Sequence, residues 1–104
     1  MQTTTIKLPE ELIGTAYKLG EGNVSMGIRK AIDAYLKNPT DPRPYRLPAM
    51  RVVSFKIETE KMNELFRHAA KRKTTVSALI RHQLLQMMKE EVGKARVVSI
   101  TRLK

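Results

Sequence analysis

Polar and apolar residues alternate one by one at two places in this chain. Ile6 and Leu8 are separated and preceded by polar residues, and Val53, Phe55 and Ile57 stand in the same alternation further on. A period of two is typical of a strand that buries one face. Because an isolated strand is not stable in water, we expect these two stretches to pair with each other.

Each alternating stretch is followed by two apolar runs at helical spacing. Pro9 suits the first turn of a helix, Gly20 and Gly22 end that helix, and Asn23 is a good N-cap for the next one. Thr75 takes the N-cap position in the second half of the chain. Four apolar stripes are expected to be buried: Leu12, Ile13, Ala16 and Tyr17; Val24, Ile28, Ala31, Ile32, Tyr35 and Leu36; Met62, Leu65 and Phe66; and Leu84, Met87 and Met88.

The order strand, helix, helix therefore occurs twice, and "NVSMGIR" in the first half matches "TVSALIR" in the second. Ile6 precedes Asn23 by 17 residues and Phe55 precedes Thr75 by 20, so the first copy lacks about one turn of its first helix. Two such copies can pair their strands antiparallel and interlock their helices around a two-fold axis, as one domain. The predicted segments are a first repeat (1–38), a Pro-rich linker (39–50), a second repeat (51–92) and a basic C-terminal segment (93–104).

The charge of the chain points to a polyanionic partner. Twenty basic residues against ten acidic ones give a formal net charge of +10. Nucleic acid is the commonest partner of so basic a small chain, although an acidic protein or an anionic lipid would also fit. The chain has no cysteine, which suits a reducing cytoplasm, and it has no apolar run long enough for a membrane span.

Residues that could carry out catalysis or bind a metal are scarce. His68 and His82 have no second ligand at a metal-like spacing, and "GEGN" lacks the lysine and the preceding buried strand of a phosphate loop. Met87 and Met88 fit a core better than a ligand site. We therefore expect no enzyme activity, no metal and no cofactor.

The doubled pattern resembles the ribbon-helix-helix family of DNA-binding proteins, which includes Arc-, CopG- and MetJ-like members. The resemblance covers residues 3–91 and depends on the alternating strands together with "GNVSMGIR" and "TTVSALIR". It implies a mainly α fold with a two-stranded antiparallel β-ribbon, here a tandem ribbon-helix-helix forming an intrachain pseudo-dimer. Two copies fused in one chain are similar to the TraY-like relaxosome proteins of conjugative plasmids.

The resemblance also implies the site. The ribbon face turned away from the helices would enter the major groove of double-stranded DNA, where lysine and hydroxyl groups can bond base edges and an apolar side chain can contact a thymine methyl group. The start of each second helix would bind phosphate through its unpaired backbone N–H groups. The base-contacting residues would be Thr3, Thr5, Lys7, Val52, Ser54 and Lys56, and the phosphate-binding residues would be Asn23, Val24, Ser25, Thr75, Val76, Ser77 and, from the basic run at 71–74, Lys73.

Three roles fit such a protein. The leading hypothesis is a cytoplasmic, nucleoid-associated transcriptional repressor that binds a specific sequence, with two or more chains side by side on a longer operator. A relaxosome-type accessory protein of a plasmid is one alternative. An antitoxin that binds a toxin as well as DNA is another, disfavoured because only about a dozen residues follow the second repeat.

The C-terminal segment repeats part of the second strand. "RVVSI" from Arg96 to Ile100 matches "RVVSF" from Arg51 to Phe55. We expect either a basic, disordered arm that touches the DNA backbone or a third strand, with the arm slightly preferred.

Overall fold

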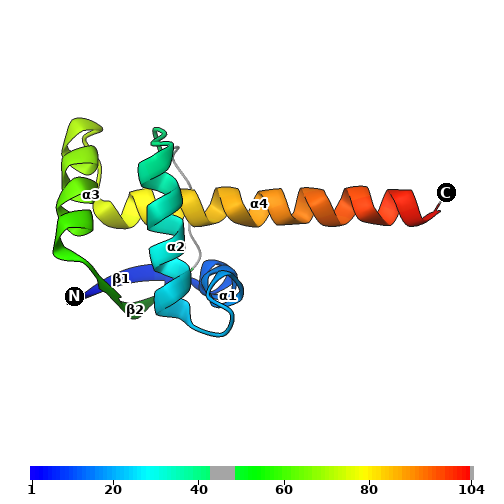
Figure 1. The fold of residues 1–104 in the computed structure, drawn as a ribbon, viewed down its shortest axis with the longest axis horizontal. Helices are drawn as coiled ribbons and strands as arrows, with labels where there is room; N and C mark the ends of the chain where they lie inside the picture. The colour runs from blue at the N-terminus through cyan, green and yellow to red at the C-terminus, as the bar shows by residue number, and fades with distance from the viewer. Residues whose placement is uncertain (43–48, 104) are drawn as a thin grey trace.

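Two strands and four helices make up the described part of the chain, in the order β1, α1, α2, β2, α3, α4 (Figure 1). The structure, a computed structural model, describes residues 1–42 and 49–103, with side chains described up to Glu90. Their bounds are β1 Gln2–Pro9, α1 Glu10–Leu19, α2 Val24–Lys37, β2 Met50–Ile57, α3 Thr59–Lys71 and α4 Val76–Leu103. The prediction of a mainly helical fold with a two-stranded antiparallel sheet is confirmed. Residues 43–48 of the predicted linker lie outside the described residues.

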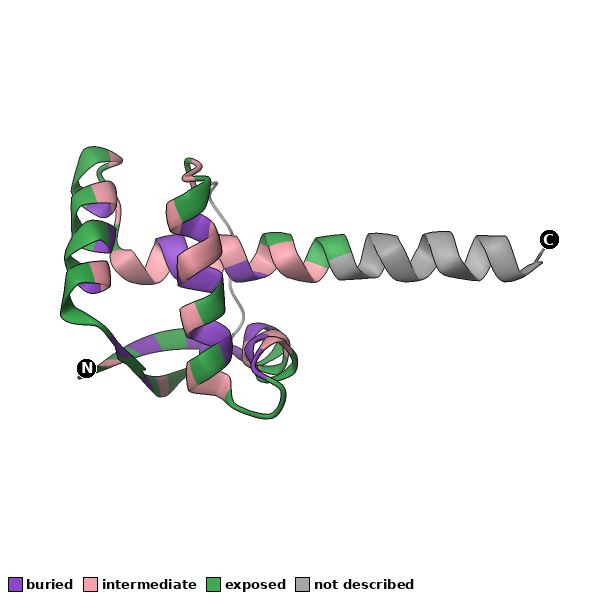
Figure 2. Ribbon diagram, in the orientation of Figure 1, coloured by how far each residue is buried: buried purple, intermediate pink, exposed green. Residues whose placement is uncertain are grey.

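The two strands pair with each other along their whole length. β1 and β2 are antiparallel, with Thr5 opposite Ser54, Thr3 opposite Lys56 and Lys7 opposite Val52. Exposed and buried residues alternate along both strands, and the helices lie over one face of the ribbon (Figures 1 and 2). The pairing of the two alternating stretches within one chain is therefore confirmed.

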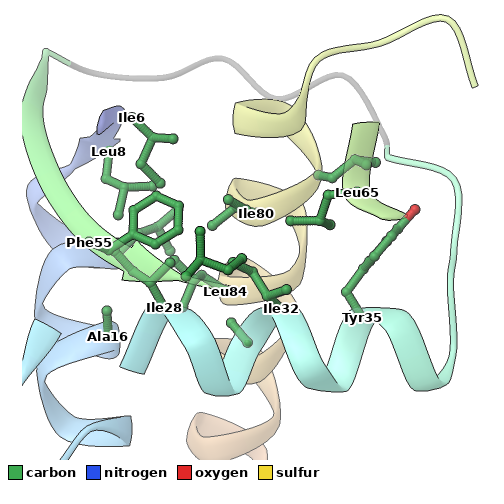
Figure 3. Packing of buried hydrophobic residues seen from close by; sticks show 14 of the residues in the cluster. Ile6, Leu8, Ala16, Ile28, Ile32, Tyr35, Phe55, Leu65, Ile80 and Leu84 are labelled. Atoms are coloured by element: carbon green, nitrogen blue, oxygen red, sulfur yellow. The ribbon is translucent and has the colours of Figure 1, made fainter. Parts of the chain in front are cut away.

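Among the side chains that the structure describes, one apolar core joins all six elements. Ile6 and Leu8 of β1 and Phe55 and Ile57 of β2 enter it from the ribbon, and Figure 3 shows the side chains of Ile6, Leu8 and Phe55 turned toward the helices. The helices supply Leu12, Ala16, Ile28, Ala31, Ile32, Tyr35, Met62, Leu65, Ala69, Leu79, Ile80 and Leu84. Val24, Leu36, Met87 and Met88 are half-buried against this core, so their predicted packing is also confirmed.

Two aromatic residues predicted for the core lie outside it. Tyr17 is 55% exposed and Phe66 is 57% exposed. Both stand at the edge of an apolar stripe, and helical spacing alone does not fix how wide the buried face is. The small residues Ala16 in α1 and Ala69 in α3 are instead almost fully buried. The prediction that Tyr17 and Phe66 belong to the buried stripes is wrong.

Helices α1 and α2 approach each other closely because glycine stands at their contact. A Cβ atom on Gly27 would lie 1.7 Å from the carbonyl oxygen of Ala16, and one on Gly20 would lie 1.8 Å from the carbonyl oxygen of Asn23. Any larger residue at either position would force the backbones apart. In the second half, the position of Gly27 in the motif is taken by Leu79, which is fully buried.

The turns between the paired helices have the same backbone geometry. Glu21 follows the C-cap Gly20 with φ 53°, and Lys73 follows the C-cap Arg72 with φ 53°. α1 has 10 residues and α3 has 13, in line with the predicted loss of about one turn. Pro9 is the extended N-cap residue of α1 rather than its first helical residue.

The first residues of the linker are tied to the second half of the chain. The hydroxyl of Tyr35 donates to the carbonyl oxygen of Thr40 at 2.9 Å, and Thr40 Oγ1 lies 3.0 Å from Nε2 of His82. Asp41 forms an ion pair with Arg72 at 2.9 Å. The first residues of the linker are therefore held by contacts with α2, with α4 and with the C-cap of α3.

The C-terminal segment does not form a strand or a disordered arm, and both of those expectations are wrong. Helix α4 continues through Arg96 to Leu103 and projects beyond the other helices (Figure 1). Gly93 costs a helix only about 1 kcal/mol, and Lys94, Ala95 and Arg96 directly after it favour helix. Without a strand to pair with, the alternation from Arg96 to Ile100 has nothing to stabilise it as a sheet.

Candidate nucleic-acid interface

The face of the ribbon turned away from the helices carries the six residues predicted to contact bases. Side-chain direction alternates along a strand, so burying Ile6, Leu8, Phe55 and Ile57 leaves the intervening residues on the other face. Val52 is 64% exposed, and the other five are exposed as well. The structure therefore brings together Thr3, Thr5, Lys7, Val52, Ser54 and Lys56 on one solvent-facing surface, which we call the outer face.

Both second helices begin beside the outer face. The hydroxyl of Ser25, in the first turn of α2, accepts a hydrogen bond from the backbone N–H of Lys56 at 2.9 Å. At the other end of the ribbon, Thr75 and Ser77 at the start of α4 line a shallow hollow together with Lys7 and Val52. Each second helix therefore begins beside one end of the ribbon.

The predicted caps are present at both helix starts. Asn23 Oδ1 accepts from the N–H of Met26 at 3.1 Å, and Thr75 Oγ1 accepts from the N–H of Ala78 at 3.1 Å. One detail of the prediction is wrong, because the N–H of Asn23 is not unpaired: it donates to the carbonyl oxygen of Gly20 at 3.2 Å. The tight turn that follows Gly20 uses this donor. The backbone of Asn23 therefore offers no N–H to an anion in this conformation.

Each second helix carries one arginine that donates a hydrogen bond to the strand of the other half. Nη1 of Arg29 in α2 donates to the carbonyl oxygen of Lys56 in β2 at 3.2 Å. Nη1 of Arg81 in α4 donates to the carbonyl oxygen of Lys7 in β1, also at 3.2 Å. Burial lowers the pKa of the Arg81 guanidinium from its ordinary value. These bonds hold the backbone of Lys7 and Lys56, the two lysines whose side chains project from the outer face.

The strand ends are held by another matching pair of contacts. Arg51 of β2 forms an ion pair with Glu10 at the start of α1, at 3.2 Å. In the other half, Thr59 at the start of α3 donates its hydroxyl hydrogen to Oε1 of Gln2 in β1, also at 3.2 Å. Gln2 and Arg51 are 49 positions apart, as are Glu10 and Thr59. The same offset separates Lys7 from Lys56.

The two helix-helix turns differ in charge although they share a shape. Lys73 is exposed at the position where the first turn carries the exposed Glu21. Lys73 would attract a phosphate close to the start of α4, whereas Glu21 would repel one close to the start of α2. At this pair of turns the positive charge therefore lies in the second half.

Three residues of this surface have no role in the sequence-based interpretation. Met50 extends the outer face beyond Val52 and lines the hollow beside α4. Arg29 and Arg81 occupy the same place in the two matched motifs, and that repetition is the sequence feature that could have singled them out. The repetition does not predict the hydrogen-bond acceptor of either arginine, which is a backbone carbonyl group in the opposite half.

Comparison of the chain with protein-family models, with curated proteins and with solved structures gave no match. Within the part of the chain that the structure describes, no helix has the length and apolar character needed to cross a bilayer. A search of the same residues for three or more His, Cys, Asp or Glu side chains arranged around a possible metal position also found none.

Proposed function

We propose that this protein binds double-stranded DNA with sequence preference by inserting the β1–β2 ribbon, outer face first, into the major groove. The observation that carries the proposal is the outer face itself: one exposed surface of a two-stranded ribbon bearing two lysines, three hydroxyl side chains and one valine. A major groove about 12 Å wide admits a two-stranded ribbon. Strands of eight residues, about 27 Å long at 3.4 Å per residue, extend over several base pairs.

The chemistry of the outer face suits base edges. Lysine ammonium groups donate to O6 and N7 of guanine, hydroxyl groups donate or accept, and valine packs on the methyl group of thymine. An ammonium group lacks the two-pronged geometry of a guanidinium, so Lys7 and Lys56 favour moderate rather than stringent discrimination. The formal net charge of +10 adds attraction to DNA of any sequence.

Repeated contacts support the further proposal that the chain is a tandem ribbon-helix-helix protein, an intrachain pseudo-dimer. Arg29 reaching Lys56 and Arg81 reaching Lys7 are the same contact made in opposite directions. Such a reciprocal exchange is what a two-fold axis through the ribbon produces. The axis would pass between Thr5 and Ser54, which face each other and are 49 positions apart.

Phosphate contacts in this proposal come from the helix starts and one turn. Backbone N–H groups of Val24, Ser25, Val76 and Ser77, the caps Asn23 and Thr75, and the ammonium of Lys73 would approach phosphates on either side of the groove. Because Glu21 stands where the second half has Lys73, we assign the stronger phosphate attraction to the α4 side. These contacts would fix position on the duplex without selecting a sequence.

The biological role that fits best is a cytoplasmic transcriptional repressor or regulator. A relaxosome-type accessory role would use the same outer face on a plasmid site. An antitoxin role would require a second protein partner, so co-purification of a small protein with the chain would favour it. Catalysis forms no part of the proposal.

Binding to a library of duplexes at several salt concentrations tests the proposal. We expect a preferred sequence and a linear fall of log affinity with log salt, with a slope of about −4 to −5 if about five phosphates are neutralised. The net charge alone predicts a salt dependence but no preferred sequence. Failure to bind duplex DNA at low salt would refute the proposal, and equal affinity for all sequences would refute its sequence preference.

A further inference from the structure

A half-turn about an axis through the centre of the ribbon places the outer face almost on itself. Residues 49 positions apart occupy equivalent places on it, since Thr5 and Ser54 face each other at its centre. Lys7 is then equivalent to Lys56, and the exposed Met1 to the exposed Met50. The remaining equivalent pair is Thr3 and Val52, a hydroxyl side chain against an apolar one.

This pair makes the two ends of the ribbon chemically different. Lys7 lies opposite Val52 at one end, whereas Lys56 lies opposite Thr3 at the other. Threonine and valine have almost the same shape, so the difference is a hydroxyl group exchanged for a methyl group. Val52 is 64% exposed, and its isopropyl group gains by contact with a thymine methyl group, whereas Thr3 gains by a hydrogen bond to a base edge.

We propose that the Thr3/Val52 pair sets the direction in which the chain lies on its DNA site, with Val52 over a thymine in one half of the site. This inference depends on the proposed DNA binding. The central residues Thr5 and Ser54 both carry hydroxyl groups and lie beside the axis, so they distinguish the two directions less. The charge difference between Glu21 and Lys73 acts on phosphates, which are present whatever the sequence, and therefore cannot select a direction by sequence.

The magnitude of the preference follows from the groups exchanged. If the chain lies in the wrong direction on its site, Val52 loses its contact with a thymine methyl group and Thr3 loses one hydrogen bond to a base edge. Each loss corresponds to about a fourfold to fivefold change in affinity, so the correct direction should be favoured by about tenfold or more.

Direction can be measured because the chain has no cysteine of its own. A single cysteine introduced at the exposed Lys18, in the helix leading to Asn23, would carry a fluorescent donor, and the acceptor would be placed on one end or the other of the preferred duplex. Energy transfer should be high with one end and low with the other. The exchange variant T3V/V52T keeps every atom type on the outer face and should reverse which end gives high transfer.

Single variants serve as matched controls. V52T makes the two ends alike and should give equal transfer to both ends of the same duplex, and T3V should do so too. Replacing thymine by deoxyuridine, one position at a time, should weaken the unaltered chain about fourfold at the base under Val52 and weaken V52T less, because threonine keeps only one of the two methyl groups of valine. All of these substitutions are on exposed strand positions and preserve shape, so folding is retained.

The outcomes separate this inference from the proposed function. Reversal of the transfer pattern by T3V/V52T supports the inference. Tight, sequence-preferring binding with no directional preference, or with a direction that the exchange does not reverse, overturns the inference and leaves DNA binding standing. Absence of DNA binding overturns both.

Discussion

Nη1 of Arg81 lies 3.2 Å from the carbonyl oxygen of Lys7, although 74 residues separate them along the chain. The guanidinium belongs to α4 and the carbonyl belongs to β1, so the last helix holds the first strand. Arg29 makes the matching contact from α2 to Lys56 of β2 at 3.2 Å. Neither half of the chain can therefore form its complete set of contacts without the other.

Removing these two arginines should destabilise the ribbon. A hydrogen bond to a charged donor contributes about 1–2 kcal/mol at partly exposed positions, so R29A/R81A should lower the free energy of unfolding by about 2–3 kcal/mol. The melting temperature should fall by roughly 10 °C or more for a chain of this size. Thermal unfolding measures the loss, and hydrogen exchange of the β1 and β2 amides should show reduced protection.

Arg67 provides the control for that experiment. It is exposed on α3, so R67A should change the free energy of unfolding by no more than about 0.5 kcal/mol. If R67A were as damaging as R29A/R81A, the effect would reflect lost positive charge, and the contacts with Lys7 and Lys56 would not be the cause.

Lys7 and Lys56 should matter more for a preferred site than for random DNA. Truncating both ammonium groups removes base-edge donors, and K7A/K56A should weaken the preferred duplex by about tenfold per lysine. The control K37A/K89A removes the same charge from two exposed lysines outside the outer face and should weaken both kinds of duplex equally. Fluorescence anisotropy at fixed salt measures all four affinities. Equal losses on both duplexes in K7A/K56A would mean that the lysines contact only phosphates.

Two glycines in the first half should respond oppositely to the same substitution. G27A would place a methyl group 1.7 Å from the carbonyl oxygen of Ala16, so α1 would be forced away from α2 and stability should fall by several kcal/mol. Gly14 has no atom within 4 Å of its would-be Cβ, and it lies inside α1. G14A should therefore stabilise the protein by about 0.5–1 kcal/mol through helix propensity. Chemical denaturation compares the two, and a stable G27A protein would contradict the close packing of α1 on α2.

The sequence predicts the strands, the helices and the outer face because their determinants are local. Alternation fixes which side of β1 and β2 is buried, and Asn23 and Thr75 mark helix starts by their own side-chain chemistry. The width of a buried helical face is not local, which explains why Tyr17 and Phe66 were misplaced. The pairing of Arg29 and Arg81 with carbonyl groups of distant strands is not determined locally either.

The two copies of "RVVS" show the same limit most directly. At Arg51 the stretch is a strand because β1 lies beside it, and at Arg96 the same residues are helical because α4 leads into them. β-Branched residues tolerate both states, and their surroundings decide between them. The exposure of the six candidate residues on one surface could be predicted because the outer face follows from the strands, whereas their contact with DNA stays a prediction. The hydrogen bond that the N–H of Asn23 donates to Gly20 is not predicted by the sequence pattern, because it depends on the turn that follows Gly20.

Tyr35 should make the fold sensitive to alkaline pH. Its hydroxyl donates to Thr40 and its ring is buried, and burial raises the pKa of this phenol above its ordinary 10.0, an effect opposed by Arg72 and assisted by Asp41. The folded state thus keeps a proton that the unfolded state releases first. The contribution of Tyr35 to stability is complete below pH 10.0 and is lost as pH rises from there through the raised pKa, with a slope of at most about 1.4 kcal/mol per pH unit.

The variant Y35F isolates this contribution. At neutral pH it should lose about 1 kcal/mol with the bond to Thr40, and above pH 10 its stability should fall less steeply than that of the unaltered chain. The pKa of Lys61 is also raised, chiefly by its hydrogen bond to Asp33. Loss of the Lys61 proton at high pH therefore lowers the stability of both proteins. Urea unfolding from pH 8 to pH 11.5 gives the difference between the two curves, from which the Lys61 contribution cancels. Parallel curves over this range would show that Tyr35 does not titrate as a buried phenol.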